Sequence, residues 1–167
     1  MSSVIGLVEV FADPAGIVEG LLGAGIYGLT DVRVARADSR VVVFWLTLDP
    51  WADLADHDYP TERVAISIER TGAIRATPVD YKGRPWLHVF SDDLLPVLCL
   101  WDPEDPPALQ WSWDEGLAAY VIVVHRHLQA EEYWRRHQDW PGEDAPHGPG
   151  PHPIRTPELR AIASKGA

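Results

Sequence analysis

Cysteine is scarce in this chain, since one cysteine, Cys99, occurs among 167 residues. A single thiol cannot form an internal disulfide, and it excludes a zinc site built from several cysteines. The sequence is therefore typical of neither disulfide-stabilised secreted proteins nor cysteine-rich zinc proteins. We expect a protein of the reducing cytoplasm.

Positive charge is also scarce. Lysine and arginine together number 14 against 25 aspartates and glutamates, which gives a formal net charge of −11. Such a chain offers no basic surface on which phosphate groups would gather. We therefore expect no nucleic-acid partner and no binding to an anionic membrane, and a basic protein surface is the more fitting partner.

Long apolar runs and a leader sequence are missing from the pattern as well. No run approaches the roughly 18 residues needed to span a bilayer. Residues 1–6 (Met-Ser-Ser-Val-Ile-Gly) lack the basic start of a signal peptide. These absences favour a soluble, intracellular protein.

What the chain has in quantity is apolar side chains, which make up 46% of it. For this length, that content is enough for the core of one domain. From residue 143 onward proline, glycine and histidine dominate. We predict one domain over residues 1–148 and a proline- and glycine-rich tail over 149–167, with residues 157–164 as its one candidate helical segment.

The amino-terminal half predicts a helix followed by an antiparallel sheet. Residues 4–11 are apolar and favour a short strand or an ordered arm, whereas Asp13-Pro14 is typical of a helix start. Residues 49–60 are acidic and interrupted by prolines, so they indicate a surface loop. Strands are predicted at residues 28–37, 41–48, 63–69, 73–79 and 86–90. The second of these is an almost continuous apolar run, so we expect it at the centre of the sheet with both faces covered.

The carboxy-terminal half predicts a cysteine segment, a proline-rich loop and one long helix. Cys99 follows the apolar residues 94–98, and residues 102–107 contain three prolines in six positions. Ser112 and Glu115 have the spacing of a capping box, and apolar residues then recur at helical intervals. We predict a helix of about six turns near residues 113–137. The expected fold class is α+β: an amino-terminal helix, about four antiparallel strands, the cysteine segment and the long helix.

The residues around Cys99 leave its role open between packing and chemistry. A cysteine among apolar neighbours is typically a small, inert core residue. His88, Asp92 and Asp93 precede it closely enough to fold around it, so a thiol hydrolase with a histidine base is an alternative. The acidic residues that follow the cysteine, Asp102, Glu104 and Asp105, would raise the pKa of its thiol. This favours a thiol that is presented to an activated acyl group over one that is permanently ionised.

Metal and cofactor sites are not indicated. On one helix His125 and His127 lie about 200° apart and cannot share an ion. His147 and His152 fall in a proline- and glycine-rich stretch without fixed geometry. Trp111, Trp113, Trp134 and Trp140 bracket the long helix and most simply anchor it, with an aromatic ligand platform as the alternative.

Two parts of the carboxy-terminal half together resemble a known family. Residues 98–103 (Leu-Cys-Leu-Trp-Asp-Pro) are followed by further prolines and by Trp111-Ser112 ahead of a long helix. Residues 132–134 (Glu-Tyr-Trp) and 140–148 (Trp-Pro-Gly-Glu-Asp-Ala-Pro-His-Gly) form a second signature. In this order the segments resemble the ubiquitin-conjugating-enzyme-like (UBC-like) fold family, and the second signature resembles its bacterial members. The detailed resemblance spans about residues 86–148.

The resemblance implies an acyltransferase that works through a cysteine thioester. It implies that an activating enzyme passes a protein's carboxy terminus to Cys99, from which the acyl group moves to an amine. The implied partners are that activating enzyme and, as the conjugated protein, a ubiquitin-like protein or a cyclic-nucleotide synthase. Bacterial members commonly belong to antiphage defence operons. The alternative within the same fold is a catalytically silent protein-binding module in which Cys99 only packs.

One departure from the family pattern concerns the residue that assists the oxyanion formed during acyl transfer. Eukaryotic members carry a histidine, proline, asparagine motif shortly before the cysteine, whereas residues 88–90 here are His-Val-Phe and the chain has no asparagine. His88 is therefore the matching position, and the oxyanion donor must be a backbone amide or another side chain. We expect His147, in the second signature, to be a candidate that folds back near Cys99.

Overall fold

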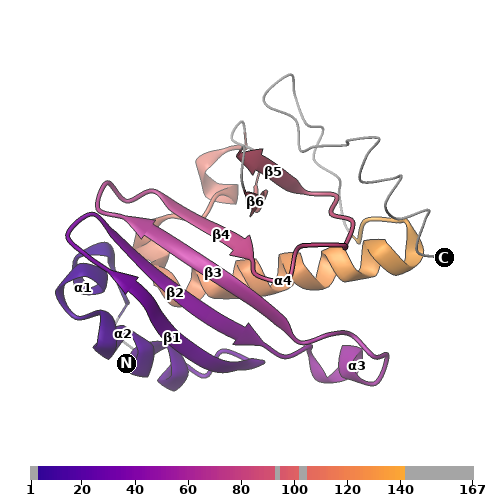
Figure 1. The fold of residues 1–167 in the computed structure, drawn as a ribbon, viewed down its shortest axis with the longest axis horizontal. Helices are drawn as coiled ribbons and strands as arrows, with labels where there is room; N and C mark the ends of the chain where they lie inside the picture. Colours follow the sequence, from indigo (N-terminus) through magenta and orange to yellow (C-terminus); the bar gives the residue numbers. More distant parts are fainter. Residues whose placement is uncertain (1–3, 93–94, 102–104, 142–167) are drawn as a thin grey trace.

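The computed structural model describes residues 4–92, 95–101 and 105–141. Its fold is α+β with an amino-terminal helix, a four-stranded antiparallel sheet and a long carboxy-terminal helix, as the sequence predicts (Figure 1). A two-stranded hairpin was not predicted: the strand expected at residues 86–90 begins at Val89, and part of the cysteine segment pairs with it. The elements are α1 (Leu7–Ala12), α2 (Pro14–Gly23), β1 (Leu29–Ala37), β2 (Val41–Leu48), α3 (Ala52–Ala55), β3 (Glu62–Glu69), β4 (Ile74–Pro78), β5 (Val89–Asp92), β6 (Leu95–Leu98), the 3₁₀ turns η1 (Pro107–Leu109) and η2 (Trp113–Glu115), and α4 (Gly116–His137).

The amino-terminal segment is helical where a strand or an arm was expected. Leu7, Val10 and Phe11 have i, i+3, i+4 spacing, which places them on one face of α1, and Val10 is fully buried. The run was too short for its period to be distinguished in the sequence. The next helix confirms the prediction, because the Asp13 side chain accepts a hydrogen bond from the Gly16 amide at 3.0 Å and Pro14 occupies the first turn.

The sheet is an antiparallel meander in the order β1-β2-β3-β4. The expectation that both faces of β2 are covered is wrong. Val42, Phe44, Leu46 and Leu48 point into the core, whereas Trp45 on the other face is 47% exposed. The core-facing residues pack with those of α4, which runs along one face of the sheet (Figure 1), and this leaves the other face open.

The long helix begins and ends close to its predicted bounds. The capping box between Ser112 and Glu115 is present, and it closes the 3₁₀ turn η2 immediately before α4. The helix ends at His137, where Gln138 adopts a left-handed conformation. The predicted loop at residues 49–60 contains the single-turn helix α3. None of the helices within the described ranges is long and apolar enough to cross a membrane.

Candidate functional site

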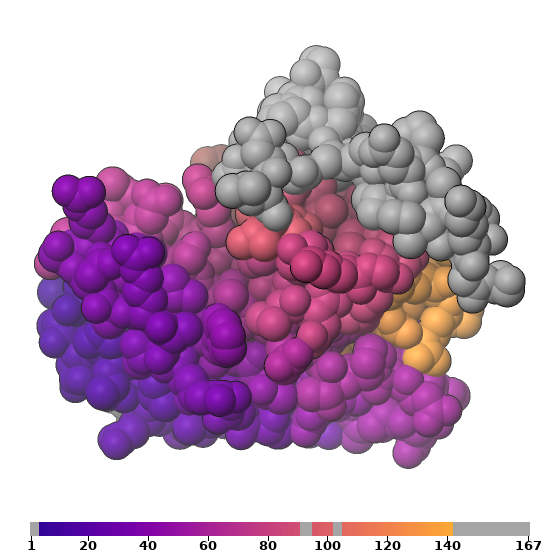
Figure 2. Space-filling model, viewed as in Figure 1, coloured from indigo at the N-terminus to yellow at the C-terminus, as the bar shows by residue number. Residues whose placement is uncertain are grey.

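Cys99 is positioned by the hairpin of β5 and β6. The two strands pair in antiparallel register, with Val89 opposite Leu98. One residue further, the Cys99 amide donates to the His88 carbonyl oxygen at 2.9 Å, which extends the pairing beyond both strands. The structure therefore brings His88 and Cys99, two of the predicted site residues, side by side. Figure 2 shows the chain leading into the hairpin, in pink, at the surface between the purple sheet and the orange end of α4.

The thiol itself is almost enclosed. Cys99 is 6% exposed, and its Sγ lies 3.6 Å from the Trp101 carbonyl oxygen, a hydrogen-bond distance for a sulfur donor. The indole of Trp101 packs edge-on against Tyr120 of α4, with ring centroids 6.2 Å apart. The main chain on both sides of Cys99 is thus fixed to neighbouring structure.

His88 is buried beneath the carboxy-terminal end of the described chain. Its ring is tilted against Trp140 with centroids 4.2 Å apart and meets the edge of His127 at 6.2 Å. Its carbonyl oxygen accepts from Cys99 and lies 3.1 Å from His127 Nε2. For that second hydrogen bond, His127 must carry its proton on Nε2.

A buried carboxylate from α4 receives the main chain just before the hairpin. Glu131 is fully buried, and its Oε1 accepts from the His88 amide at 2.6 Å and its Oε2 from the Leu87 amide at 2.9 Å. His127 Nε2 lies 3.6 Å from the same Oε1. One side chain of α4 thus binds two consecutive peptide units beside the cysteine.

The environment keeps Glu131 ionised. Burial by itself raises the pKa of this carboxyl, but the hydrogen bond and charge of His127, together with the Leu87 and His88 amides, outweigh burial. The pKa of Glu131 is therefore lowered from its ordinary value. An ionised carboxylate is the form that accepts two amide hydrogen bonds at once.

A second set of charges surrounds the loop that leads to β5. Arg84 binds Glu62, which is buried, and lies 3.5 Å from Glu132 of α4. Arg135 binds Glu132 at 2.8 Å. The guanidinium groups of Arg84 and Arg135 lie over the Trp86 ring, 5.2 and 4.8 Å from its centre. This network fastens the loop to α4 at a short distance along the chain from Glu131.

Sequence reasoning missed Glu131 and the second role of His127. Glu132 was noted as part of the family signature, and His127 was considered only as a metal ligand. A signal existed in the sequence, since Glu131 falls on the same helical stripe as Leu117, Val124 and Leu128. A charged residue on a core-facing stripe indicates buried partners, but their identity cannot be read from the pattern.

The helix histidines face different neighbours, as their spacing predicts. The His125 ring packs edge-on against Trp51 at 5.7 Å, whereas His127 lies against His88 and Trp140. Burial lowers the pKa of His125. In the part of the chain that the structure describes, no three histidine, cysteine, aspartate or glutamate side chains are grouped to hold a metal ion.

Three of the four tryptophans that were predicted to anchor α4, namely Trp111, Trp113 and Trp140, have defined partners. Trp111 donates from its indole nitrogen to the Gly116 carbonyl oxygen at 3.0 Å, and Trp113 donates to Gly72 at 2.8 Å. Trp140 covers the two histidines beyond the other end of the helix. These three side chains connect the helix ends to the turn after β3 and to the cysteine site.

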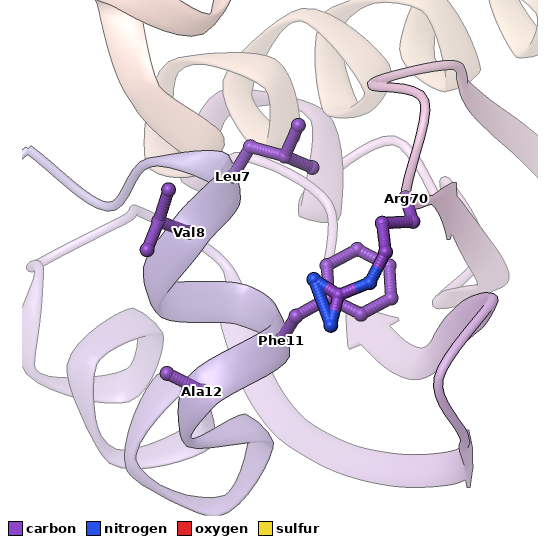
Figure 3. Close-up of a pocket in the computed structure, with 5 residues that line it drawn as sticks. All are labelled: Leu7, Val8, Phe11, Ala12 and Arg70. Atoms are coloured by element: carbon purple, nitrogen blue, oxygen red, sulfur yellow. The ribbon is translucent and has the colours of Figure 1, made fainter.

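Two of the hollows on the surface of the described residues bear on ligand binding. A groove of about 600 Å³ runs along α3 and α4 and is bordered by Leu100, Tyr133 and Trp140. A smaller hollow of about 290 Å³ lies on α1, where Arg70 covers the Phe11 ring (Figure 3). The smaller hollow offers no thiol, histidine or carboxylate. The larger one adjoins the residue after Cys99, but of the four tryptophans predicted as an aromatic ligand platform only Trp140 lines it.

Several predicted residues lie outside the described residues. They are His147 and His152, the acidic positions Asp102 and Glu104, Asp93, and the proposed tail of residues 149–167. The second family signature is described only at Trp140 and Pro141.

Comparison with known proteins finds no matching family model, no matching curated protein and no matching solved structure. The resemblance to the UBC-like family therefore rests on the residues named in the sequence.

Proposed function

We propose that the protein is a ubiquitin-conjugating-like acyltransferase with a thioester intermediate on Cys99. One observation carries the proposal: the Cys99 amide is bound to the His88 carbonyl oxygen, which pairs the main chain of the single cysteine with that of the one residue that matches the family's histidine motif. The α+β element order supports the same proposal. By the same resemblance, the protein acts in bacterial antiphage defence in the cytoplasm.

The reaction consists of two acyl transfers. The Cys99 thiol loses its proton, and its Sγ attacks the thioester carbonyl carbon on the activating enzyme. A carbon–sulfur bond to Cys99 forms, the bond to the activating enzyme's sulfur breaks, and the leaving thiolate takes up a proton. An acceptor amine then attacks the same carbon, gives up a proton, and regenerates the Cys99 thiol as the amide forms. Placement and oxyanion stabilisation supply most of the rate in such transfers.

One main-chain amide is excluded as the hydrogen-bond donor to the oxyanion. The Cys99 amide is already donated to the His88 carbonyl oxygen, so it does not serve the oxyanion. The donor in this proposal is another main-chain amide or a side chain, and His147 remains the side-chain candidate. The conjugated protein is a ubiquitin-like protein or a cyclic-nucleotide synthase, and the thioester donor is an activating enzyme.

The test is thioester formation with the purified protein. The protein is incubated with ATP, the activating enzyme of its operon and the candidate substrate protein, and the products are separated with and without thiol reductant. We expect an adduct that reductant removes, that is absent in Cys99→Ala, and that in Cys99→Ser becomes an oxygen ester resistant to reductant. If the activating enzyme charges itself but no adduct reaches this protein, the proposal is wrong.

The burial of Cys99 favours a second candidate, a silent protein-binding module of the same fold. Its 6% exposure is typical of a packing cysteine. The two candidates differ in thiol accessibility. A transfer enzyme should be alkylated at Cys99 by iodoacetamide in the folded state, within about tenfold of the unfolded rate, whereas a packing cysteine should react only after denaturation. Retained far-ultraviolet circular dichroism during labelling is the control for folding.

A further inference from the structure

Glu131 connects α4 to the main chain that carries the reacting thiol. Its carboxylate accepts the amides of Leu87 and His88 at 2.9 and 2.6 Å and is fully buried. Side chain to main chain bonds of this kind fix the peptide unit itself and not merely a side chain. The position of the peptide between Leu87 and His88 is therefore set by the helix.

The next peptide unit, between His88 and Val89, leads to the cysteine. The His88 amide is held by Glu131, while the His88 carbonyl oxygen accepts from the Cys99 amide at 2.9 Å and lies 3.1 Å from His127 Nε2. Glu131 and His127 are one helical turn apart on α4. Two side chains of α4 thus bind the main-chain amide and the main-chain carbonyl oxygen of His88, and the same carbonyl oxygen accepts the Cys99 amide. A shift of His88 would displace Cys99 with it.

We infer that Glu131 is the positioning residue for acyl transfer at Cys99, acting through the main chain of His88. The inference rests on the proposed function for its catalytic meaning. Glu131 does not touch the reacting atoms in this scheme. It holds the Cys99 main chain so that Sγ meets the acyl carbon in a fixed direction, and displacements near 1 Å cost up to about 100-fold in transfer rate.

The neighbouring Glu132 offers a matched control. It lies on the same helix, is largely buried, and binds Arg84, Arg135 and Arg136 at 3.5, 2.8 and 2.7 Å. These partners are arginine side chains, whereas Glu131 binds main-chain amides. Glu131→Gln and Glu132→Gln therefore make the same chemical change in adjacent positions, and the inference concerns the first of them alone.

The experiment measures transfer and thiol reactivity on the full chain. Wild type, Glu131→Gln and Glu132→Gln are charged with the substrate protein, and discharge to lysine is followed over a range of lysine concentrations up to saturation, at a temperature where circular dichroism shows all three folded. We expect discharge to be about tenfold slower in Glu131→Gln, without a matching rise in the lysine concentration for half-maximal rate, and within twofold of wild type in Glu132→Gln. Equal discharge rates in the two variants would overturn the inference.

A second readout does not depend on conjugation. Alkylation of Cys99 by iodoacetamide should be several-fold faster in Glu131→Gln than in Glu132→Gln, yet slower than in the unfolded chain, because the enclosed thiol is loosened. If wild type never forms a thioester, the proposed function fails, and this comparison alone decides whether Glu131 fixes the cysteine. Should Glu131→Gln not fold, His127→Phe removes the donor to the His88 carbonyl oxygen and keeps a ring, and it must accelerate alkylation in the same way. Unchanged alkylation in a folded variant contradicts the inference.

Discussion

At the scale of one residue, Glu131 shows how an ionised side chain is stabilised where it is fully buried. A buried carboxylate is costly unless its oxygens find donors. Here Leu87 and His88 supply main-chain amides, and His127 and Arg135 lie 3.6 and 4.0 Å away. Stability should therefore depend on the ionised state of this residue.

That dependence gives a prediction for Glu131→Gln. The pKa of Glu131 is lowered in the folded protein, so its contribution to the free energy of unfolding is present above the unfolded value of about 4.5 and is lost as pH falls through the folded pKa. At pH 7 we expect the variant to be about 3 kcal/mol less stable than wild type. Urea unfolding should show this difference shrinking below about pH 4. A difference that is constant from pH 7 to pH 3 would argue that Glu131 is not ionised in the fold.

At the scale of elements, the junction between η2 and α4 depends on a glycine. Gly116 has a φ of 79°, in the left-handed region, and a Cβ there would lie 2.7 Å from Val4 Cγ1 and 3.3 Å from the Ile5 main chain. The next residue, Leu117, donates its amide to the Ile5 carbonyl oxygen at 2.9 Å. The amino-terminal segment and the start of α4 therefore meet where only a hydrogen fits.

Gly116→Ala should accordingly destabilise the fold by about 1–3 kcal/mol through strain and displacement of the amino-terminal segment. Gly23→Ala is the matched control, because Gly23 lies at the end of α2 and an added Cβ meets no atom within 4 Å. Thermal unfolding of both variants measures the contrast. If the two substitutions lower the melting temperature equally, the close approach at Gly116 has no energetic role.

At the scale of the whole molecule, the sequence was most informative where local chemistry decides structure. The Asp13-Pro14 start of α2 and the Ser112 capping box act within one turn and were predicted correctly. The apolar run of β2 could not reveal which face α4 would cover, and the short segment containing α1 gave no clear period. Both depend on what packs against them.

The candidate site likewise contains residues that could be predicted from the sequence and one that could not. Cys99 and His88 could be named from the sequence because Cys99 is the single cysteine and His88 precedes it closely, and the structure places them side by side. The role of Glu131 could not be predicted, because its partners are main-chain amides 43 and 44 residues away. Every residue except proline carries such an amide, so the sequence does not show which of them a side chain binds. The position of His147 lies outside the described residues and stays a prediction.

The central claim is that Cys99 carries a protein thioester, and intact-protein mass spectrometry tests it most directly. After reaction with the charged activating enzyme, we predict that the mass increases by that of one substrate protein minus one water, that hydroxylamine or thiol reverses the increase, and that Cys99→Ala shows none. The account is contradicted if an activating enzyme that is itself charged leaves the wild-type mass unchanged, or if the same reversible adduct forms on Cys99→Ala.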